Sequence, residues 1–314
     1  MLGLLSITFP IFALIGLGYA VTARGIFERQ DMRSLGRFVL QLALPALVFS
    51  AVSSRDLGQI VNGGYLFAYL AGSLLTAGIG ALALARVQGL DRPGLVLCVM
   101  GMSCANSGFI GYPILLLTFP AIAGVALALN MMVENLVMIP MILAALELTT
   151  VSQGAHRGAV LRRTVGRLIR QPLMLALAAG LLVALLGLHL PAALTRTVGI
   201  LAGASAALSL SVIGGSLVDR PRGEGTGLAA AVAAGKLVLH PLMVAAMLWF
   251  GARIGLPVAE PLHTAAILMA AVPMMGIYPV LAQAHGREGL ASLSLLYSVV
   301  AAFGSLTLAL ALLH

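Results

Sequence analysis

Two short segments rich in glycine and proline interrupt long apolar stretches of this chain. The first reads Asn-Ser-Gly-Phe-Ile-Gly-Tyr-Pro at 106–113, and the second reads Pro-Met-Met-Gly-Ile-Tyr-Pro at 273–279. Proline removes a backbone donor and clashes with the preceding turn, and glycine raises the entropic cost of a helix. In lipid, non-helical backbone is tolerated only where it is buried in protein or lines a wet cavity. Two breaks at matching places in two halves of a chain are therefore typical of a membrane transporter's binding site.

The composition indicates a membrane environment for the whole chain. Of the 314 residues, 61% are hydrophobic and 9% are charged, and the mean hydropathy is +1.07. A soluble domain carries about 25% charged residues, so this chain has too few to cover a water-facing surface. Apolar runs recur along the chain at about the 20 residues that a membrane helix needs. We expect an all-α polytopic protein embedded in the lipid bilayer, whose first apolar run is a membrane helix and not a signal peptide.

Ten transmembrane segments are expected. Their approximate bounds are 4–22, 35–53, 63–85, 94–119, 121–146, 171–189, 193–217, 227–251, 262–284 and 290–313. The longest charged connection follows the fifth segment. It divides the chain into a first five-helix repeat at 1–150, a cytoplasmic Arg-rich connection at 151–170 and a second five-helix repeat at 171–314. Small residues let membrane helices approach closely, so we expect packing faces at Gly72, Gly78, Gly80, Gly199 and Gly203.

The two halves share the order of their elements. Each has its broken segment in fourth place, with Tyr-Pro near the break and an unbroken fifth segment after it. Because five is an odd number of crossings, the second half enters the membrane from the opposite side. The sequence therefore predicts a 5+5 inverted repeat in which the broken helices 4 and 9 cross.

Arginines in the connections predict the orientation. The connections after segments 1, 3, 5, 7 and 9 hold 14 arginines, and those on the other side hold 3. Cytoplasmic loops carry the excess of positive charge, so both termini are expected outside and the connection around Arg162 inside. The expected location is the bacterial inner (plasma) membrane.

Four motifs resemble those of the auxin efflux carrier family. Segment 106–113 resembles that family's fourth-helix signature, and 271–279 resembles its ninth-helix crossover. Leu-Pro-Ala-Leu-Val-Phe-Ser at 44–50 resembles its second-helix motif, and Lys-Leu-Val-Leu-His-Pro-Leu at 236–242 resembles the start of its eighth helix. The resemblance covers nearly the whole chain. Unlike the plant members, this chain lacks a long cytoplasmic loop, and Ser107 follows Asn106 where they have proline.

This resemblance implies an architecture like that of bile-acid symporters and Na+/H+ antiporters. Helices 1, 2, 6 and 7 would form a scaffold, and helices 3–5 and 8–10 would form a transport domain that moves in an elevator-type alternating-access cycle. The implied substrate is a small organic anion, either an auxin-like carboxylate or a dicarboxylate such as malate or malonate. A scaffold of this kind also implies a homodimer.

The half-helix after a break begins with unpaired N–H groups and a positive dipole end, which together bind anions. Asn106 and Ser107 stand where they could cap this half-helix and face a carboxylate, and capping alone is the alternative. The predicted substrate-binding residues are Asn106, Ser107, Gly108, Tyr112, Pro273, Met275, Gly276, Tyr278, Val48 and Phe49. Tyr112 and Tyr278 either line a cavity or pack. Helix breaks are predicted at Pro45, Pro113 and Pro279, and further kinks at Pro140 and Pro241.

Two ionisable residues fall at membrane depth, where such groups are functional candidates by default. Glu134 lies in segment 5 beside Asn135, where it could carry a proton, bind a cation with Asn135, or form a structural ion pair. Lys236 lies early in segment 8, where it could attract the anion or extend to the cytoplasmic interface. Glu134, Asn135 and Lys236 are therefore the candidates for coupling transport to H+ or Na+.

Other functions find little support. Phosphate-binding loops, zinc-protease motifs and nucleophile elbows do not occur in the sequence, so we expect neither an enzyme nor a cofactor. Cys98 and Cys104 have no nearby set of metal ligands, and no metal site is expected. The net charge of +8 comes from residues between apolar runs and does not suggest nucleic acid. Two alternatives stay open, namely a sodium-coupled bile-acid-type symporter and a receptor that uses the carrier fold without transport.

Overall fold

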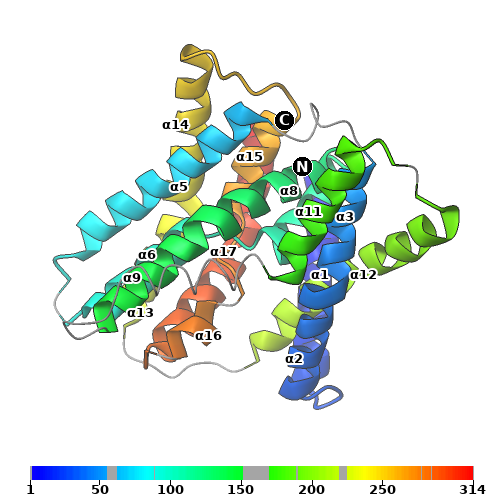
Figure 1. The fold of residues 1–314 in the computed structure, drawn as a ribbon. Helices are drawn as coiled ribbons and strands as arrows, with labels where there is room; N and C mark the ends of the chain where they lie inside the picture. Colours follow the sequence, from blue (N-terminus) through cyan, green and yellow to red (C-terminus); the bar gives the residue numbers. More distant parts are fainter. Residues whose placement is uncertain are drawn as a thin grey trace. The chain divides into compact units, whose positions relative to one another are not determined.

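The computed structural model describes residues 2–54, 62–87, 89–150, 170–188, 190–218, 225–276, 278–283 and 285–313. Most of the predicted Arg-rich connection, 151–169, lies outside these residues. The described residues form helices and the loops between them, and their one β-type pairing is an isolated antiparallel bridge between Ala105 and Met274 (Figure 1). The expected all-helical character is confirmed for the part of the chain that the structure describes.

Among the described residues, six helical stretches are long and apolar enough to cross a membrane. They are Gln30–Ser53, Gly63–Leu84, Ala123–Thr149, Ala192–Ser216, Thr226–Arg253 and Glu288–Leu312. Shorter apolar helices lie at Phe9–Ala23, Arg92–Ser103, Ser107–Thr118, Pro172–Leu185 and Leu262–Ala271. A polytopic membrane protein is thereby supported. The count of ten crossings and the 5+5 inverted repeat stay predictions.

Four of the prolines are preceded by a five-residue π-helical turn. The ring of proline clashes with the carbonyl four residues earlier, and its nitrogen donates no hydrogen bond. In every case that carbonyl belongs to the middle residue of the turn, so the wider turn relieves the clash without ending the helix. The turns are η1 (Val39–Ala43) before Pro45, η2 (Ser107–Gly111) before Pro113, η3 (Glu134–Met138) before Pro140 and η4 (Gly235–Leu239) before Pro241. At Pro45 the predicted break is thus a widened turn inside a continuous helix.

The chain forms two compact units that are each discontinuous in sequence. The first unit comprises the described residues of Met1–Asn62, Ser107–Asn130 and Ile169–Asp219. It contains α1 (Leu2–Ala23), α2 (Arg29–Phe38), α3 (Leu44–Ser53), α7 (Tyr112–Thr118), most of α8 (Ala123–Val133), α11 (Pro172–Leu185) and α12 (Ala192–Ser216).

Helix α12 is the centre of the first unit, where it packs on α1, α2 and α3 (Figure 1). Glycines make the crossing of α1 and α12 tight. A Cβ at Gly18 would overlap the carbonyl of Ser211, and a Cβ at Gly214 would overlap the carbonyl of Ile15. Backbone contact of this kind is how small residues hold membrane helices together.

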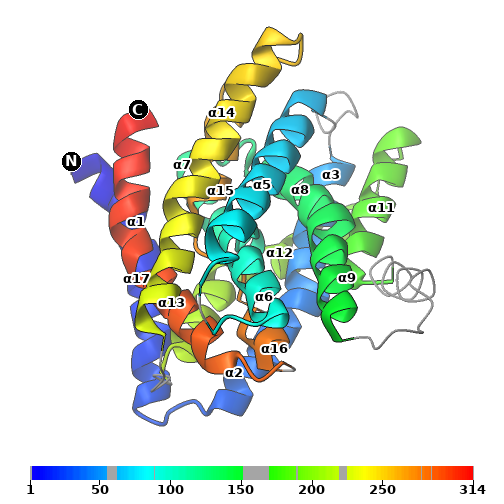
Figure 2. The same ribbon diagram turned by 90° about the vertical axis from the view of Figure 1, so that its left-hand side faces the viewer.

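The second unit comprises the described residues of Gly63–Asn106, Met131–Leu168 and Arg220–His314. It contains α5 (Gly63–Leu84), α6 (Arg92–Ser103), α9 (Ile139–Thr150), α13 (Thr226–Ala234), α14 (His240–Arg253), α15 (Leu262–Ala271), α16 (Tyr278–Gln283) and α17 (Glu288–Leu313). Helices α5 and α14 lie side by side along much of their length (Figure 2).

The predicted glycine packing faces are only partly present. A Cβ at Gly72 would lie 2.7 Å from the Cα of Val244 on α14, and one at Gly80 would lie 3.0 Å from the sulfur of Met102. By contrast, a Cβ at Gly78, Gly199 or Gly203 would meet no described atom within 4 Å. Sequence period does not reveal which glycine faces a neighbouring helix.

Candidate functional site

The two broken segments meet in the second unit. Helix α6 ends at Ser103, and Cys104 is extended, with φ −110° and ψ 125°. Helix α15 ends at Ala271, and Val272 is extended, with φ −69° and ψ 158°. Ala105 and Met274 form the antiparallel bridge between the two extended segments. We call these segments, 104–106 and 272–275, the paired break.

The first interruption lies at the N-terminal edge of its sequence signature. Residues 107–118 are already helical, because η2 accommodates Pro113. The backbone N–H of Asn106 donates to the carbonyl oxygen of Pro273 at 2.9 Å. This bond pairs one buried N–H of the first break with one buried carbonyl of the second. Buried main-chain groups need such partners.

Glu134 reaches the paired break from the π-turn η3. Its side chain is 1% exposed, and its Oε1 accepts the backbone N–H of Ala105 at 3.0 Å. Asn135 turns instead to its own helix, where its Nδ2 donates to the carbonyl oxygen of Met131 at 3.1 Å. Of these two neighbouring residues, Glu134 therefore bonds to the paired break and Asn135 bonds to its own helix.

Lys236 reaches the other half of the paired break from the π-turn η4. Its side chain is fully buried, and its Nζ donates to the carbonyl oxygen of Ala270 at the end of α15. A helix C-terminus carries partial negative charge and unpaired carbonyls, so an ammonium there is well placed. Lys236 therefore does not extend to the membrane interface.

His240 links Lys236 to helix α5. Lys236 Nζ lies 3.1 Å from His240 Nδ1, and Ser73 Oγ lies 2.9 Å from His240 Nε2. Both distances are those of hydrogen bonds, and the donor in each follows the tautomer of His240.

Sequence reasoning missed the residues that α5 contributes. The Tyr69 ring packs edge-on against His240 with centroids 5.6 Å apart, and its hydroxyl donates to the carbonyl oxygen of Met269 at 3.4 Å. Tyr65 stacks on Tyr69 at 6.1 Å. Tyr65, Tyr69 and Ser73 follow each other at four-residue spacing, which puts them on one helix face. That polar face within an apolar segment was the available signal.

The other predicted substrate residues of the second unit differ in exposure. Asn106 is 3% exposed, Pro273 is buried and Tyr278 is fully buried, whereas Met275 is half-buried and Gly276 is exposed. Pro279 follows Tyr278 in the first turn of α16. Tyr278 contacts the place where a Cβ at Gly101 would lie, 3.2 Å from its ring, so it packs against α6.

The remaining predicted residues belong to the first unit. Ser107 is buried, and its Oγ accepts from Asn130 Nδ2 at 3.0 Å. Gly108, Tyr112, Pro113, Pro45 and Val48 are buried there, and Phe49 is half-buried. Asn130 is a further polar residue that sequence reasoning did not select.

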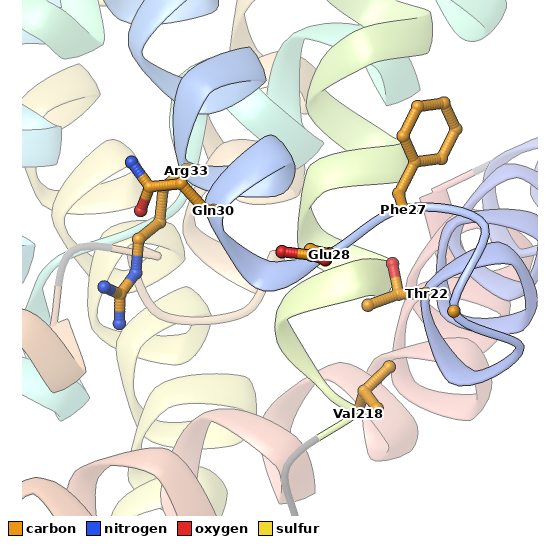
Figure 3. A pocket seen from close by; sticks show the side chains of 7 residues that line it. Thr22, Phe27, Glu28, Gln30, Arg33 and Val218 are labelled. Atoms are coloured by element: carbon orange, nitrogen blue, oxygen red, sulfur yellow. The ribbon is translucent and has the colours of Figure 1, made fainter.

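A surface hollow of about 590 Å³ lies in the first unit where α1 leads into α2 (Figure 3). It is lined by Thr22, Gly25, Phe27, Glu28, Gln30, Arg33 and Val218. None of these is a predicted site residue. Glu28 and Asp31 already bond each other's backbone as a capping box at the start of α2.

The part of the chain that the structure describes offers no set of metal ligands. Those residues contain no group of three or more His, Cys, Asp or Glu side chains that could hold a metal ion. Cys98 and Cys104 are buried free thiols. The paired break presents backbone groups, the amide of Asn106 and the side chains of Glu134 and Lys236.

A family model and one known protein match this chain over most of its length, and a second known protein matches a third of it. The family model described as "Membrane transport protein" matches residues 5–310. A Rhizobium meliloti protein named "Putative malonate transporter" is 28% identical over 290 residues, which cover 90% of this chain and 86% of that protein. A Methanothermobacter thermautotrophicus protein named "Uncharacterized transporter" is 30% identical over 106 residues, 33% of this chain and 34% of that protein. The family match spans both breaks and both buried charges.

Proposed function

Since this chain belongs to the family of membrane transport proteins that includes the auxin efflux carriers, we propose that it is a secondary transporter of a small organic anion. The family match confirms the resemblance drawn from the four motifs. The observation that carries the proposal is the paired break, where main-chain groups and two buried charges gather inside an apolar unit. Groups of this kind are costly in a membrane protein and are kept where a substrate passes.

The proposed substrate is a carboxylate, either a dicarboxylate or an auxin-like monocarboxylate. The relative named for malonate supports the first of these. Asn106 supplies an amide at the paired break, and Pro273, Met275, Gly276 and Tyr278 are the proposed neighbours on the second segment. Ser107, Gly108, Tyr112, Val48 and Phe49 of the first unit stay predicted substrate contacts.

The proposed mechanism is an elevator-type alternation. In its support, the described residues of helices 1, 2, 6 and 7 gather in one compact unit, and those of helices 3, 8 and 10 gather in the other with both sides of the paired break. Residues 107–130, which hold the end of segment 4 and the start of segment 5, belong instead to the first unit. In the proposal, helices 1, 2, 6 and 7 are the scaffold, and helices 3–5 and 8–10 are the transport domain. A homodimer built on the scaffold belongs to the same proposal, and a one-chain mass in mild detergent and in nanodiscs would contradict it.

The coupling ion is proposed to act through Glu134 and Lys236, with Asn135 as a candidate beside them. Both side chains are buried in the same unit, where an ion bound at one would change the electrostatics of the other. Proton-coupled transport responds to a pH gradient, sodium-coupled transport responds to a sodium gradient, and uncoupled passage responds to neither. One transport assay therefore separates the three.

The test is transport by the full chain in proteoliposomes. A thermal-shift screen of carboxylates, from malonate to indole acetate, selects the probe. Labelled probe is then followed under a pH gradient, a sodium gradient or neither. We expect saturable passage of at least one carboxylate. Binding without passage would overturn transport and favour the receptor, and passage that requires sodium would favour the bile-acid-type symporter.

Glu134→Gln addresses the proton in the same assay. The amide cannot ionise, so a proton-coupled carrier should lose accumulation driven by the pH gradient while retaining substrate exchange. An unchanged pH dependence in this variant would show that Glu134 carries no proton.

A further inference from the structure

A backbone donor is left inside the second unit where helix α6 ends. Ala105 is 1% exposed, and Cys104 before it is fully buried. A buried N–H without an acceptor costs free energy comparable to a lost hydrogen bond. Ala105 N–H does not join the bridge to the second break, since the hydrogen bond there comes from Asn106. Its acceptor is Oε1 of Glu134, 29 residues along the chain, at 3.0 Å.

The place of Glu134 in the chain explains how it reaches this donor. It is the first residue of η3, the π-turn that precedes Pro140. Helix α5 packs against η3. Proline, the π-turn and α5 together hold one carboxylate against one peptide group, so the bond is built into the fold.

We propose that Glu134 is a positioning residue whose side-chain oxygen fixes the paired break at Ala105 and thereby sets the orientation of Asn106. In taking Asn106 as a substrate residue, the inference rests on the proposed function. Asn106 follows Ala105 directly, and its own N–H is bonded to Pro273. Two consecutive peptide groups are thus held from two directions, which fixes the direction in which the Asn106 side chain leaves the backbone.

Two substitutions of Glu134 separate this role from proton carriage. Glutamine presents a carbonyl oxygen at the reach of the carboxylate, so it still accepts the Ala105 N–H although it cannot ionise. Alanine presents no acceptor. A positioning role is therefore retained in Glu134→Gln and lost in Glu134→Ala, whereas proton carriage is lost in both.

The native thiol of Cys104 reports the state of the break without any transport measurement. In the full chain in nanodiscs, with Cys98→Ala to leave one thiol, alkylation of Cys104 by N-ethylmaleimide is followed by mass spectrometry. We expect Glu134→Ala to raise the alkylation rate about tenfold or more, because without the hydrogen bond to Ala105 the break opens more often. Glu134→Gln should stay within about threefold of the parent. Glu147→Ala, on the exposed face of α9, is the matched control and should not change the rate.

A second variant removes the donor in place of the acceptor. Ala105→Pro deletes the N–H, and the extended Cys104 before it is compatible with a following proline. Ala105→Pro should raise the alkylation rate of Cys104 as Glu134→Ala does. If the Glu134→Ala chain does not fold, Ala105→Pro tests the proposal in its place. A parent-like alkylation rate in a folded Glu134→Ala or Ala105→Pro chain would overturn the proposal. So would a glutamine variant that labels as fast as the alanine variant.

Binding of malonate is measured on the same samples. Where the parent binds malonate, Glu134→Ala should weaken the affinity about tenfold or more and Glu134→Gln less than about threefold. Parent-like affinity in Glu134→Ala would contradict the effect on Asn106. A parent that binds no carboxylate of the panel would refute the proposed function, while the Cys104 result would still decide whether Glu134 holds the break.

Discussion

The backbone N–H of Asn106 donates to the carbonyl oxygen of Pro273 at 2.9 Å, and this bond joins the two breaks of the chain. Asn106 therefore holds the paired break with its main chain, while its side-chain amide lies buried at the same place. Because alanine keeps the main-chain bond, a substitution at this position changes the amide alone.

Asn106→Ala should raise the dissociation constant of the transported carboxylate. A hydrogen bond to a charged group contributes roughly 1.5–3 kcal/mol, so the loss corresponds to about ten- to a hundredfold. Isothermal titration or thermal shift with the carboxylate chosen by the screen measures the change. Tyr19→Phe, on the exposed side of α1, serves as the control and should bind as the parent does. A folded Asn106→Ala chain with parental affinity would place the site elsewhere.

Gly72→Ala should destabilise the second unit, and Gly78→Ala on the same helix should not. A methyl group at Gly72 would meet the backbone of Val244, and overpacking of this kind costs about 1–3 kcal/mol. At Gly78 it would meet no described atom within 4 Å, so the gain in helix propensity, about 0.5–1 kcal/mol, remains. Thermal unfolding in detergent compares the two variants. Equal melting temperatures would contradict the close approach of α5 and α14.

Asp91 caps α6 and pairs with Arg287, and these two roles are separable. Its side chain accepts from Gly94 N at 2.9 Å, and Arg287 lies 3.0 Å from its Oδ1. Asp91→Asn keeps a capping oxygen and loses the ion pair, which for exposed groups contributes about 0–1 kcal/mol. Asp91→Ala loses the cap as well, at about 1 kcal/mol more. Chemical or thermal unfolding should rank the parent above Asp91→Asn and that variant above Asp91→Ala, with Arg287→Gln close to Asp91→Asn.

The Asp91 ion pair should lose its contribution only in acid. Desolvation raises the pKa of this carboxyl, but hydrogen bonds from Arg287 and Gly94 and the Arg287 charge outweigh it and hold the pKa below its ordinary value. A carboxyl with a lowered folded pKa stabilises the fold above its unfolded pKa, about 3.9, and loses that contribution as the pH falls through the folded pKa. The difference in unfolding free energy between the parent and Asp91→Asn should therefore stay constant from about pH 5 to about pH 8 and shrink below about pH 4. A difference that shrinks above pH 5 would contradict this assignment.

The orientation with both termini outside is tested by labelling single introduced cysteines in intact cells. An impermeant thiol reagent should reach position 253 from outside and position 162 only after the membrane is opened, because 14 arginines lie in the connections on one side and 3 on the other. The native thiols are buried and should stay silent. Labelling of position 162 from outside would reverse the proposed topology.

The sequence determined the properties that follow from local composition. The low charge and long apolar runs indicated a helical membrane protein, and the four motifs indicated the family that the comparison with known proteins then confirmed. The kinks predicted at Pro140 and Pro241 coincide with π-turns, since the clash of a proline ring with an earlier carbonyl depends on the chain next to it. Glu134 and Lys236 stood out because charge is rare at membrane depth.

The tertiary structure decided what these groups bond to. Nothing in the sequence indicated that Glu134 accepts the N–H of Ala105, that Lys236 turns inward to the carbonyl of Ala270, or that Ser73 completes the contact with His240. The tertiary structure also distinguished Gly72, which faces Val244, from Gly78, which faces no described neighbour. Partners of this kind come from distant parts of the chain, and they are selected by how helices pack and by the need to satisfy every buried polar group. A local pattern identifies the group that needs a partner, and packing alone supplies it.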